Sequence, residues 1–480
     1  NERHSLKPEE KMRKNYHEVS LPEVLYAREK RVLRQKELLL QYKKPLLCFT
    51  MNIAGPVKNS PLIRQGFLYG LEDFALQLQR VKAEILYREI WDEATGNEAF
   101  LVIDASPVTI KRSACELEDA DPLGRLYDMD LLMPAKDSAS GFRKMEREEL
   151  GFSGRQCLLC KRPAKECASR RIHPLSELVA RTDEILKTAI RERTAIRIAE
   201  LATRSLLYEV AITPKPGLVD RANNGSHRDM DFYSFLNSAA ALQSYFKKCA
   251  AFGIQAAEKA EREKREDLPE LFRSLRLPGK LAENQMLRAT GGVNTHRGAI
   301  FSMGILCAAV ASLPADRWDE SETILSICAR MTKGIMAEDY RNLTVDTAKT
   351  AGQRLYLEYG ITGVRGQMEE GLPAGSAYGL PLLEKLLAEG RSTDEAGAAV
   401  LLAILSHTTD TNLIARSDLP TQKEASRRAG ELLEHSPCPP REQIEELDRE
   451  FIQKNLSPGG SADLLALCWM LHFLKTDRSP

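Results

Sequence analysis

One stretch of the second half of the chain combines residues that could bind phosphate and a cation. Residues 456–468 read Leu-Ser-Pro-Gly-Gly-Ser-Ala-Asp-Leu-Leu-Ala-Leu-Cys. The proline ends a preceding helix, and Ser461 is predicted to cap the next one, which puts Asp463 in its first turn. Free backbone N–H groups at such a turn attract anions, and Gly459 and Gly460 have no side chain to block a ligand. The pattern fits either a capped core helix or a phosphate site with a carboxylate at its entrance.

A second candidate site is a pair of aspartates in the stretch 124–131, which reads Gly-Arg-Leu-Tyr-Asp-Met-Asp-Leu. Because side chains alternate along a strand, Asp128 and Asp130 should point to the same face. Two such carboxylates can hold Mg²⁺, which completes its shell with water and phosphate oxygens. With Arg125 in the preceding turn, the arrangement suits displacement of pyrophosphate at a phosphorus atom. The alternative is a solvent-facing strand edge that carries two acids.

Cysteines and a histidine follow with the spacing Cys-x2-Cys-x6-Cys-x5-His. This spacing is compatible with a tetrahedral zinc site made of three thiolates and one imidazole. The alternative is a group of reduced thiols beside a histidine that simply precedes the next helix. The residues concerned are Cys157, Cys160, Cys167 and His173.

Four loops in the second half place short polar side chains beside glycines or prolines, between apolar helices. Acids, amides and basic groups at helix junctions suit a polyphosphate with bound Mg²⁺. Each residue also has a simpler explanation, because lone histidines are often structural and acids or glycines often cap helices or form turns. The candidates are Lys215, Gly217, Asp220, Asn223, His227, Asp229, Asn294, Thr295, His296, Arg297, Arg365, Asp410 and Asn412.

Two kinds of scaffold must position these residues. In the first half we predict helices at 21–42 and from 61 to about 78, and strands at 46–54 and 99–105. Residues 114–118 and 126–133 are predicted to form a hairpin around the turn 121–124. After the charged helical stretch 175–194, only helical periodicity is present. We therefore predict a multidomain chain with an α+β domain containing a mixed sheet, residues 1–185, and an all-α domain, residues 186–480.

Composition excludes several classes of function. The formal net charge of the 480 residues is zero, so no bulk attraction to nucleic acid is expected. No apolar run reaches the roughly 18 residues that a membrane span needs, and residues 1–14 have no secretory signal pattern. Ten cysteines in a chain of this length do not suggest a disulfide framework. We expect a cytoplasmic protein that binds neither nucleic acid nor a membrane.

The motifs of the second half closely resemble the triphosphoribosyl-dephospho-coenzyme A synthase family. They lie at 215–220, 292–296, 410–412 and 457–463, with His227 and Asp229 between the first two. In the first half, Gly55-Pro56-Val57-Lys58, the stretch 124–130 and the stretch 155–160 resemble the holo-citrate lyase synthase family, which implies a nucleotidyltransferase-like domain. The whole chain therefore looks like a natural fusion of two enzymes.

The resemblance of the second half implies that the 2′-hydroxyl of 3′-dephospho-coenzyme A attacks the ribose C1′ of ATP and expels adenine. The transition state should resemble an oxocarbenium ion, which carboxylates stabilise. Asp220 or Asp229 would act as base or cation stabiliser, and His227 or His296 would protonate adenine. The other implied residues are Asp410 and Asp463 on Mg²⁺, Lys215 and Arg297 on phosphate oxygens, and Gly217, Asn223, Asn294, Thr295, Arg365, Asn412, Gly459, Gly460 and Ser461 on the substrates.

The resemblance of the first half implies that a serine hydroxyl of the acyl carrier (γ) subunit of citrate lyase attacks the α-phosphorus of the triphosphoribosyl group. Asp128 and Asp130 would hold Mg²⁺ as diphosphate leaves, while Arg125 and Lys58 would contact the substrate. Two alternatives stay open at this point. The same chemistry could serve malonate decarboxylase, or the chain could be a zinc-stabilised scaffold that binds nucleotide without turning it over. Gln367 and Thr409 depart from the synthase pattern, where glutamate and glycine are expected.

Overall fold

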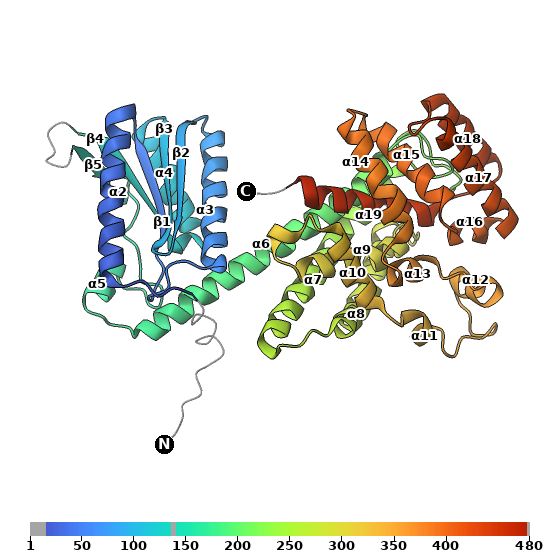
Figure 1. Cartoon of the computed structure of the whole chain (residues 1–480), viewed down its shortest axis with the longest axis horizontal. Coiled ribbons are helices and arrows are strands. Elements are labelled where there is room, and N and C mark those ends of the chain that lie inside the picture. Colours follow the sequence, from blue (N-terminus) through green and yellow to red (C-terminus); the bar gives the residue numbers. More distant parts are fainter. Residues whose placement is uncertain (1–15, 136–140, 478–480) are drawn as a thin grey trace, which may run out of the picture. The chain divides into compact units, whose positions relative to one another are not determined.

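The computed structural model describes residues 16–135 and 141–477. The chain forms two compact units, which divide between Glu192 and Arg193 (Figure 1). This division falls inside one helix, α6 (Leu175–Ala211), and the boundary predicted at residue 185 lies in the same helix. Ile185 and Leu186 of α6 belong to the core of the first unit, whereas residues from Ala195 onward belong to the core of the second.

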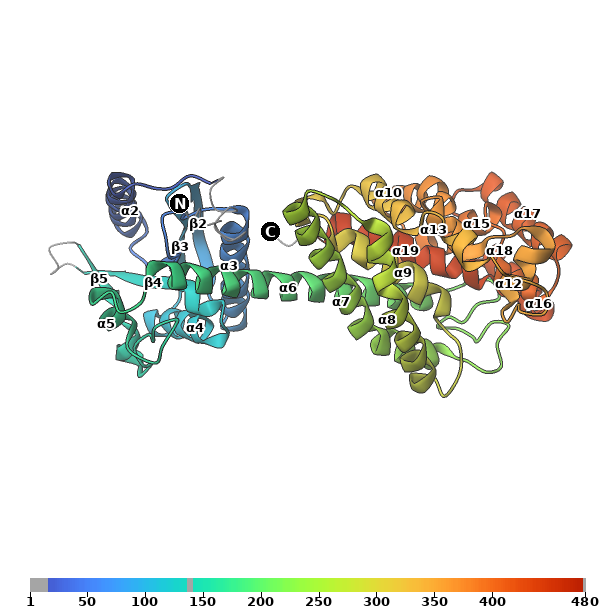
Figure 2. The same cartoon turned by 90° about the horizontal axis from the view of Figure 1, so that it is seen from below.

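The first unit is an antiparallel sheet with helices on both faces (Figure 2). The strands are paired in the order β2-β3-β1-β4-β5. Helix α2 packs on one face, and α3 and α4 pack on the other, where the larger apolar cluster of this unit lies. The elements are α2 (Leu21–Tyr42), β1 (Leu46–Met51), α3 (Pro61–Arg80), β2 (Glu84–Glu93), β3 (Gly96–Asp104), α4 (Pro107–Ala120), β4 (Tyr127–Pro134), β5 (Phe142–Met145) and α5 (Ala164–Ser169).

Two sequence predictions for this unit were wrong. The sheet is not mixed, because all four strand pairings of the described residues are antiparallel. Residues 114–118 are not a strand of a hairpin but belong to helix α4. Ser106 caps this helix by accepting a hydrogen bond from the Thr109 N–H at 3.1 Å, and Pro107 occupies its first turn. Ile110, Ala114 and Glu118, spaced four residues apart, then form its buried face.

The second unit is mostly helical, as predicted, and its centre consists of three helices that are apolar on nearly every side. These are α9 (Arg297–Ala311), α15 (Thr393–Ser406) and α19 (Gly459–Thr476). The surrounding helices are α7 (Phe232–Glu263), α8 (Leu268–Ala289), α10 (Ser321–Thr332), α11 (Ile335–Asp339), α12 (Ala351–Tyr359), α13 (Gly363–Glu369), α14 (Leu380–Ala388), α16 (Thr411–Arg416), α17 (Leu419–His435) and α18 (Arg441–Gln453).

The start of α19 differs from the prediction. The helix begins at Gly459, so Ser461 is its third residue and does not cap it. Its first N–H groups need acceptors from elsewhere, and Asp410, 51 residues earlier in the chain, provides one. Among the described residues, no helix is both long and apolar enough to cross a membrane.

Two candidate active sites

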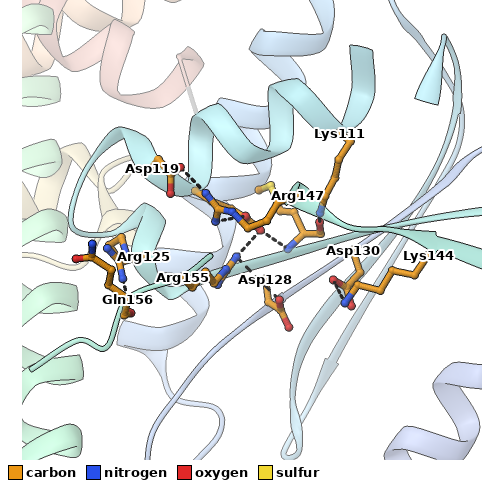
Figure 3. A network of polar contacts seen from close by, with 11 residues as sticks. Lys111, Asp119, Arg125, Asp128, Asp130, Lys144, Arg147, Arg155 and Gln156 are labelled. Carbon is orange, nitrogen blue, oxygen red and sulfur yellow. Dashed lines mark hydrogen bonds and ion pairs between the residues drawn. The ribbon is translucent and has the colours of Figure 1, made fainter. Parts of the chain in front are cut away.

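The first candidate site lies on β4. Burial alternates along this strand, so Tyr127 and Met129 are buried while Asp128 and Asp130 are half-exposed on the opposite face, as predicted. Their side chains are 39% and 34% exposed. Figure 3 shows both carboxylates on the side of β4 that faces away from α4. Burial raises the pKa of Asp128, and the negative charge of Asp130 raises it further. A cation between the two carboxylates would relieve this repulsion.

Basic residues from two later segments surround the aspartates. Lys144 of β5 places its Nζ 2.7 Å from Asp130 Oδ1. Arg155 places a guanidinium nitrogen 4.0 Å from Asp128 Oδ1 and also forms an ion pair with Glu118 (Figure 3). Neither cation was predicted as a site residue, although Arg155 begins the stretch 155–160 that resembles the transferase family; Lys144 belongs to no motif named above.

Two side chains of helix α4 form hydrogen bonds with the backbone of β4 at this site. The Met129 N–H donates to Glu118 Oε1 at 2.9 Å, and Lys111 Nζ donates to the Met129 carbonyl at 3.0 Å. Strand β5 pairs with β4 only from Leu131 onward, so these two buried side chains satisfy backbone groups that β5 does not reach. Glu118 also pairs with Arg147 of the turn after β5, at 3.4 Å. The backbone that carries Asp128 and Asp130 is therefore held in place by side chains.

The structure gives the other predicted residues of this unit contacts with neighbouring segments. Arg125 donates to the Gln156 carbonyl at 2.6 Å, so it contacts the segment that carries Arg155 (Figure 3). Lys58 Nζ donates to the Ile53 carbonyl at 2.6 Å in the segment that follows β1. The zinc candidates Cys157, Cys160, Cys167 and His173 converge, and one ligand atom of each lies within 4.8 Å of all the others.

The second candidate site is centred on Asp410, which joins two helices. Its Oδ1 accepts the N–H groups of Asn412 and Leu413 at 2.9 and 3.2 Å and so caps α16. Its Oδ2 accepts the N–H and the hydroxyl of Ser461 at 2.7 and 2.9 Å. Asp410 therefore lies in the turn between α15 and α16, at a helix junction.

Gly459 and Gly460 allow α19 to pack closely against this turn. A Cβ atom on Gly460 would lie 3.2 Å from the Asp410 carboxylate, and one on Gly459 would lie 2.8 Å from Asn412 Nδ2. A side chain at either position would displace the Asn412 amide or the Asp410 carboxylate from its observed place. The structure thus gives both glycines a packing role within the site.

Asp463 lies close enough to Glu209 and Asp410 for their charges to act on it, and we call these three residues the acidic cluster. Asp463 lies against the first turn of α9, where a Cβ atom on Gly298 would be 1.9 Å from its Oδ2. Burial raises the pKa of Asp463 well above its usual value, and the charges of Glu209 and Asp410 add to this effect. Glu209, on α6, forms a buried ion pair with Lys215, whose Nζ also donates to the Glu209 carbonyl at 2.8 Å. Glu209 was missed because it lies inside an ordinary helix, outside every polar loop.

His296 is buried beside this cluster. Only 3% of the residue is exposed, its Nδ1 lies 2.7 Å from Ser238 Oγ, and its ring meets Phe235 edge-on at 5.0 Å. Burial and the charge of Lys215 lower its pKa to about 3, so the imidazole is neutral at physiological pH. Within the described residues, neither His296 Nε2 nor the hydroxyl of Thr295 has a hydrogen-bond partner. Two buried polar atoms are therefore available to a ligand.

The loop between α6 and α7 is organised by Asp220. Its carboxylate accepts hydrogen bonds from the Thr213 hydroxyl at 2.6 Å and from the N–H groups of Lys215, Ala222 and Asn223 at 3.2, 2.7 and 3.0 Å. Gly217 has a φ of +69°. A Cβ atom there would lie 2.1 Å from the Leu456 carbonyl oxygen, so glycine is required.

This loop is also attached to the helices that precede α19. Asp448 of α18 accepts the Gly217 N–H at 2.8 Å and the Asn223 side-chain amide at 3.0 Å. His227 lies 2.8 Å from Ser457 Oγ and 2.9 Å from a guanidinium nitrogen of Arg416. Burial, together with Arg416, lowers the pKa of His227 to about 4.

The remaining predicted residues are more exposed. Asp229 is 65% exposed, with a carboxylate oxygen 4.0 Å from His227 Nδ1. Asn294 accepts the Arg297 N–H at 3.2 Å, and the Arg297 side chain pairs with Glu283 at 3.3 Å. Arg365 pairs with Asp339 at 3.3 Å. None of the contacts described for Arg365 is with the acidic cluster.

Comparison with known proteins agrees with this division into two sites. Residues 19–189 match the family model of apo-citrate lyase phosphoribosyl-dephospho-CoA transferase, and residues 195–479 match that of ATP:dephospho-CoA triphosphoribosyl transferase. The chain is thus a fusion of two transferases. It belongs to the CitXG family: "Protein CitXG" of Haemophilus influenzae is 33% identical over 461 residues, which cover 94% of this chain and 95% of that protein.

Two further relatives support the same assignment. "Protein CitXG" of Leuconostoc mesenteroides subsp. cremoris is 32% identical over 463 residues, or 94% of this chain and 96% of that protein. The 2-(5''-triphosphoribosyl)-3'-dephosphocoenzyme-A synthase of Pectobacterium atrosepticum is 37% identical over 308 residues, covering 63% of this chain and 98% of its own length. The family resemblance inferred from the motifs is therefore confirmed. These names do not favour malonate decarboxylase or a non-catalytic scaffold.

Proposed function

We propose that this protein makes the prosthetic group of citrate lyase and attaches it to the enzyme's acyl carrier subunit. The second unit joins ATP and 3′-dephospho-coenzyme A to give 2′-(5″-triphosphoribosyl)-3′-dephospho-coenzyme A and adenine. The first unit transfers the phosphoribosyl-dephospho-coenzyme A group to a serine of the carrier and releases diphosphate. The observation that carries the proposal is that each family match contains its own cluster of carboxylates beside basic side chains.

In the second unit, Asp463 is the proposed ligand of Mg²⁺, because a cation would relieve its repulsion by Glu209 and Asp410. Asp410, the other predicted ligand, accepts hydrogen bonds from the starts of α16 and α19 with both oxygens, so we assign it to positioning, as we do Asp220 below. Mg²⁺ bound at either acidic site neutralises charge on the substrate's phosphate oxygens. Glu209 holds Lys215 near the cluster, which orients its ammonium group for the triphosphate.

The same geometry supports roles for the residues around the sugar. The 2′-hydroxyl attacks C1′ of the ATP ribose as the bond to adenine breaks, and nearby carboxylates stabilise the positive charge on the ring. His296 offers a buried nitrogen to the departing adenine. Asp220 is occupied by its own loop, so we assign it to positioning, while Asp229 beside His227 stays the candidate base. Asn294, Thr295, Arg297, Arg365 and Asn412 stay predicted substrate contacts.

In the first unit, Asp128 and Asp130 are the proposed ligands of Mg²⁺. The serine hydroxyl attacks the α-phosphorus, and the bond to the diphosphate leaving group breaks. Lys144 and Arg155 lie close enough to the aspartates to neutralise charge that develops on the phosphate oxygens. The pair of carboxylates on one face of a strand also supports a nucleotidyltransferase-like relationship.

The two halves of the proposal can be separated in one assay. The full-length protein is incubated with ATP, Mg²⁺, dephospho-coenzyme A and the apo carrier subunit, and free adenine and the mass of the carrier are measured. Asp463→Asn should stop adenine release, whereas Asp128→Asn should leave it intact and stop carrier modification. Normal release and modification in both variants would contradict the site assignments, and absence of adenine with the wild-type protein would contradict the function.

A further inference from the structure

The cysteine cluster of the first unit has the geometry of a metal site. Cys160 Sγ lies 3.5 Å from Cys167 Sγ and 3.3 Å from His173 Nε2. Ligand atoms at the corners of a zinc tetrahedron are about 3.3–3.8 Å apart, given bond lengths of about 2.0–2.3 Å. A disulfide would require sulfur atoms about 2 Å apart, and all of these cysteines are free. Three thiols and one imidazole are a donor set that suits Zn²⁺.

The backbone around the first two cysteines forms a turn that supports a metal site. Gln156 and Pro163 form an isolated antiparallel bridge. Next to it, the Cys157 N–H donates to the Arg162 carbonyl and the Ala164 N–H donates to the Arg155 carbonyl, each at 2.8 Å. The Leu159 N–H points at Cys157 Sγ at 3.4 Å. These bonds close residues 155–164 into a tight turn, which we name the cysteine turn.

The cysteine turn has little apolar packing of its own. Its residues are exposed or half-buried throughout, and Cys167, in the short helix α5 that follows, is buried. Of the side chains in the turn, Leu158 is the one packed against the apolar core of the unit. Small segments without a core are commonly held by a structural metal.

Arg155 connects this turn to the candidate active site. Its carbonyl takes part in the turn, while its guanidinium pairs with Glu118 and lies 4.0 Å from Asp128 Oδ1. The neighbouring Gln156 carbonyl accepts a hydrogen bond from Arg125 at 2.6 Å (Figure 3). Arg125 and Arg155 are therefore both attached to the same backbone segment.

We propose that Cys157, Cys160, Cys167 and His173 bind one Zn²⁺, and that this metal positions Arg155 in the transferase site. The zinc site stands on its own geometry, whereas the role of Arg155 rests on the proposed function of the first unit. Zinc bound here is structural, because all of its coordination positions are filled by protein. Without zinc, the turn loosens, and the guanidinium is no longer held beside Asp128.

The metal site is tested by the zinc content of the purified full-length protein. The wild-type protein should contain about one zinc per chain, and Cys160→Ser should lose it. Cys438→Ser, which removes a half-buried free thiol in the second unit, is the matched control and should keep it. Cobalt added to metal-free wild-type protein should give the thiolate-to-metal absorption of a tetrahedral site. Equal zinc in the two variants, or no cobalt band with reduced thiols, would overturn the site.

The positioning role is tested by comparing Arg155→Ala with Cys160→Ser. Both should lower carrier modification by about tenfold or more, and the double variant should be no worse. Arg155→Ala should keep its zinc, and adenine release by the second unit should stay normal in every variant, which shows that the chain is folded.

Hydrogen exchange gives a readout that does not depend on transfer. Amides of the segment 155–157 should exchange faster in zinc-free protein than in zinc-loaded protein. Unchanged exchange, or normal carrier modification by a zinc-free chain, would overturn the positioning role. If zinc-loaded wild-type protein fails to modify the carrier, the proposed function fails, while zinc content and exchange still decide this inference.

Discussion

Asp410 accepts both the backbone N–H and the hydroxyl of Ser461, at 2.7 and 2.9 Å, although the two residues are 51 positions apart in the chain. With its other oxygen Asp410 caps α16, so a single buried carboxylate fixes the starts of two helices. The site in the second unit therefore depends on this carboxylate for its shape as well as for its charge.

Asp410→Asn should destabilise the protein and lower adenine release. The asparagine amide would place donors against the Ser461 N–H, so one helix start loses its acceptor, at a cost of about 2–3 kcal/mol in the free energy of unfolding. Ser461→Ala removes only the hydroxyl contact and should cost about 1 kcal/mol. Denaturant unfolding and the adenine assay measure both effects. Equal stability of the two variants would contradict this account.

Asp463→Asn should stabilise the metal-free protein while it abolishes adenine release. The raised pKa of Asp463 means that its ionised form is unfavourable in the folded state near Glu209 and Asp410. The neutral amide should therefore raise the free energy of unfolding at pH 7 by about 1–2 kcal/mol. A raised carboxyl pKa lowers stability as pH rises above the unfolded value, so the gain should shrink as the pH falls towards about 4.

Added magnesium provides the control for the predicted stabilisation by Asp463→Asn. Added Mg²⁺ should stabilise the wild-type protein and not Asp463→Asn, because a ligand stabilises only the state that binds it. Asp316→Asn, at an exposed site in the same unit, should change stability by less than about 0.5 kcal/mol. A destabilised Asp463→Asn variant in metal-free buffer would contradict the prediction.

His296 should make the second unit sensitive to acid. Its folded pKa is about 3, below the value of about 6.5 for an unperturbed histidine. Below pH 6.5 the unfolded chain therefore binds a proton that the folded chain does not, and stability falls by about 1.4 kcal/mol per pH unit until the folded pKa is reached. His296→Gln should make the slope between pH 6 and 4 shallower by about 1.4 kcal/mol per pH unit while the similar contribution of His227 remains, and exposed His435→Gln should leave the slope unchanged. Parallel pH profiles for the wild type and His296→Gln would refute it.

The sequence predicted that Asp128 and Asp130 share one face of a strand, because alternation along a strand depends only on local spacing. It did not predict Arg155 or Glu118, since their positions beside Asp128 result from the packing of α4 and the cysteine turn. Local reading also assigned residues 114–118 to a strand. The Ser106 cap and the four-residue spacing of Ile110, Ala114 and Glu118 were the signals for a helix.

A long-range contact also explains why the prediction of Ser461 as an N-cap was wrong. A serine after two glycines and before an apolar run has the local pattern of an N-cap. The helix starts earlier because Asp410, from a distant turn, accepts its N–H group. Long-range contacts of this kind leave no trace in the spacing of a single sequence, and Glu209 was missed for the same reason.

Glu118→Gln should destabilise the first unit and lower carrier modification. Glu118 is 3% exposed and pairs with Arg147 and Arg155, so a neutral side chain leaves two cations without their buried partner. The expected loss is about 3 kcal/mol in the free energy of unfolding. Exposed Glu116→Gln, on the same helix, is the control and should stay within about 0.5 kcal/mol. Adenine release should not change, and a parallel loss of both activities would contradict a local effect.

Gly298→Ala should separate activity from stability in the second unit. Its new Cβ atom would lie 1.9 Å from Asp463 Oδ2, so the carboxylate must rotate out of the acidic cluster. Because a side-chain end can move and alanine favours a helix, the free energy of unfolding should change by less than about 1 kcal/mol. Adenine release should fall by about 100-fold if Asp463 holds the cation.

Gly430→Ala in α17 is the matched control for this substitution. The nearest atom to a Cβ there is Ser406 Cβ at 3.7 Å, an ordinary contact, so alanine should stabilise the helix by about 0.5–1 kcal/mol and leave adenine release unchanged. Because both substitutions add the same methyl group to a helix, the difference between them isolates the position of the Asp463 carboxylate. Full activity of Gly298→Ala would exclude Asp463 as a cation ligand in its observed conformation.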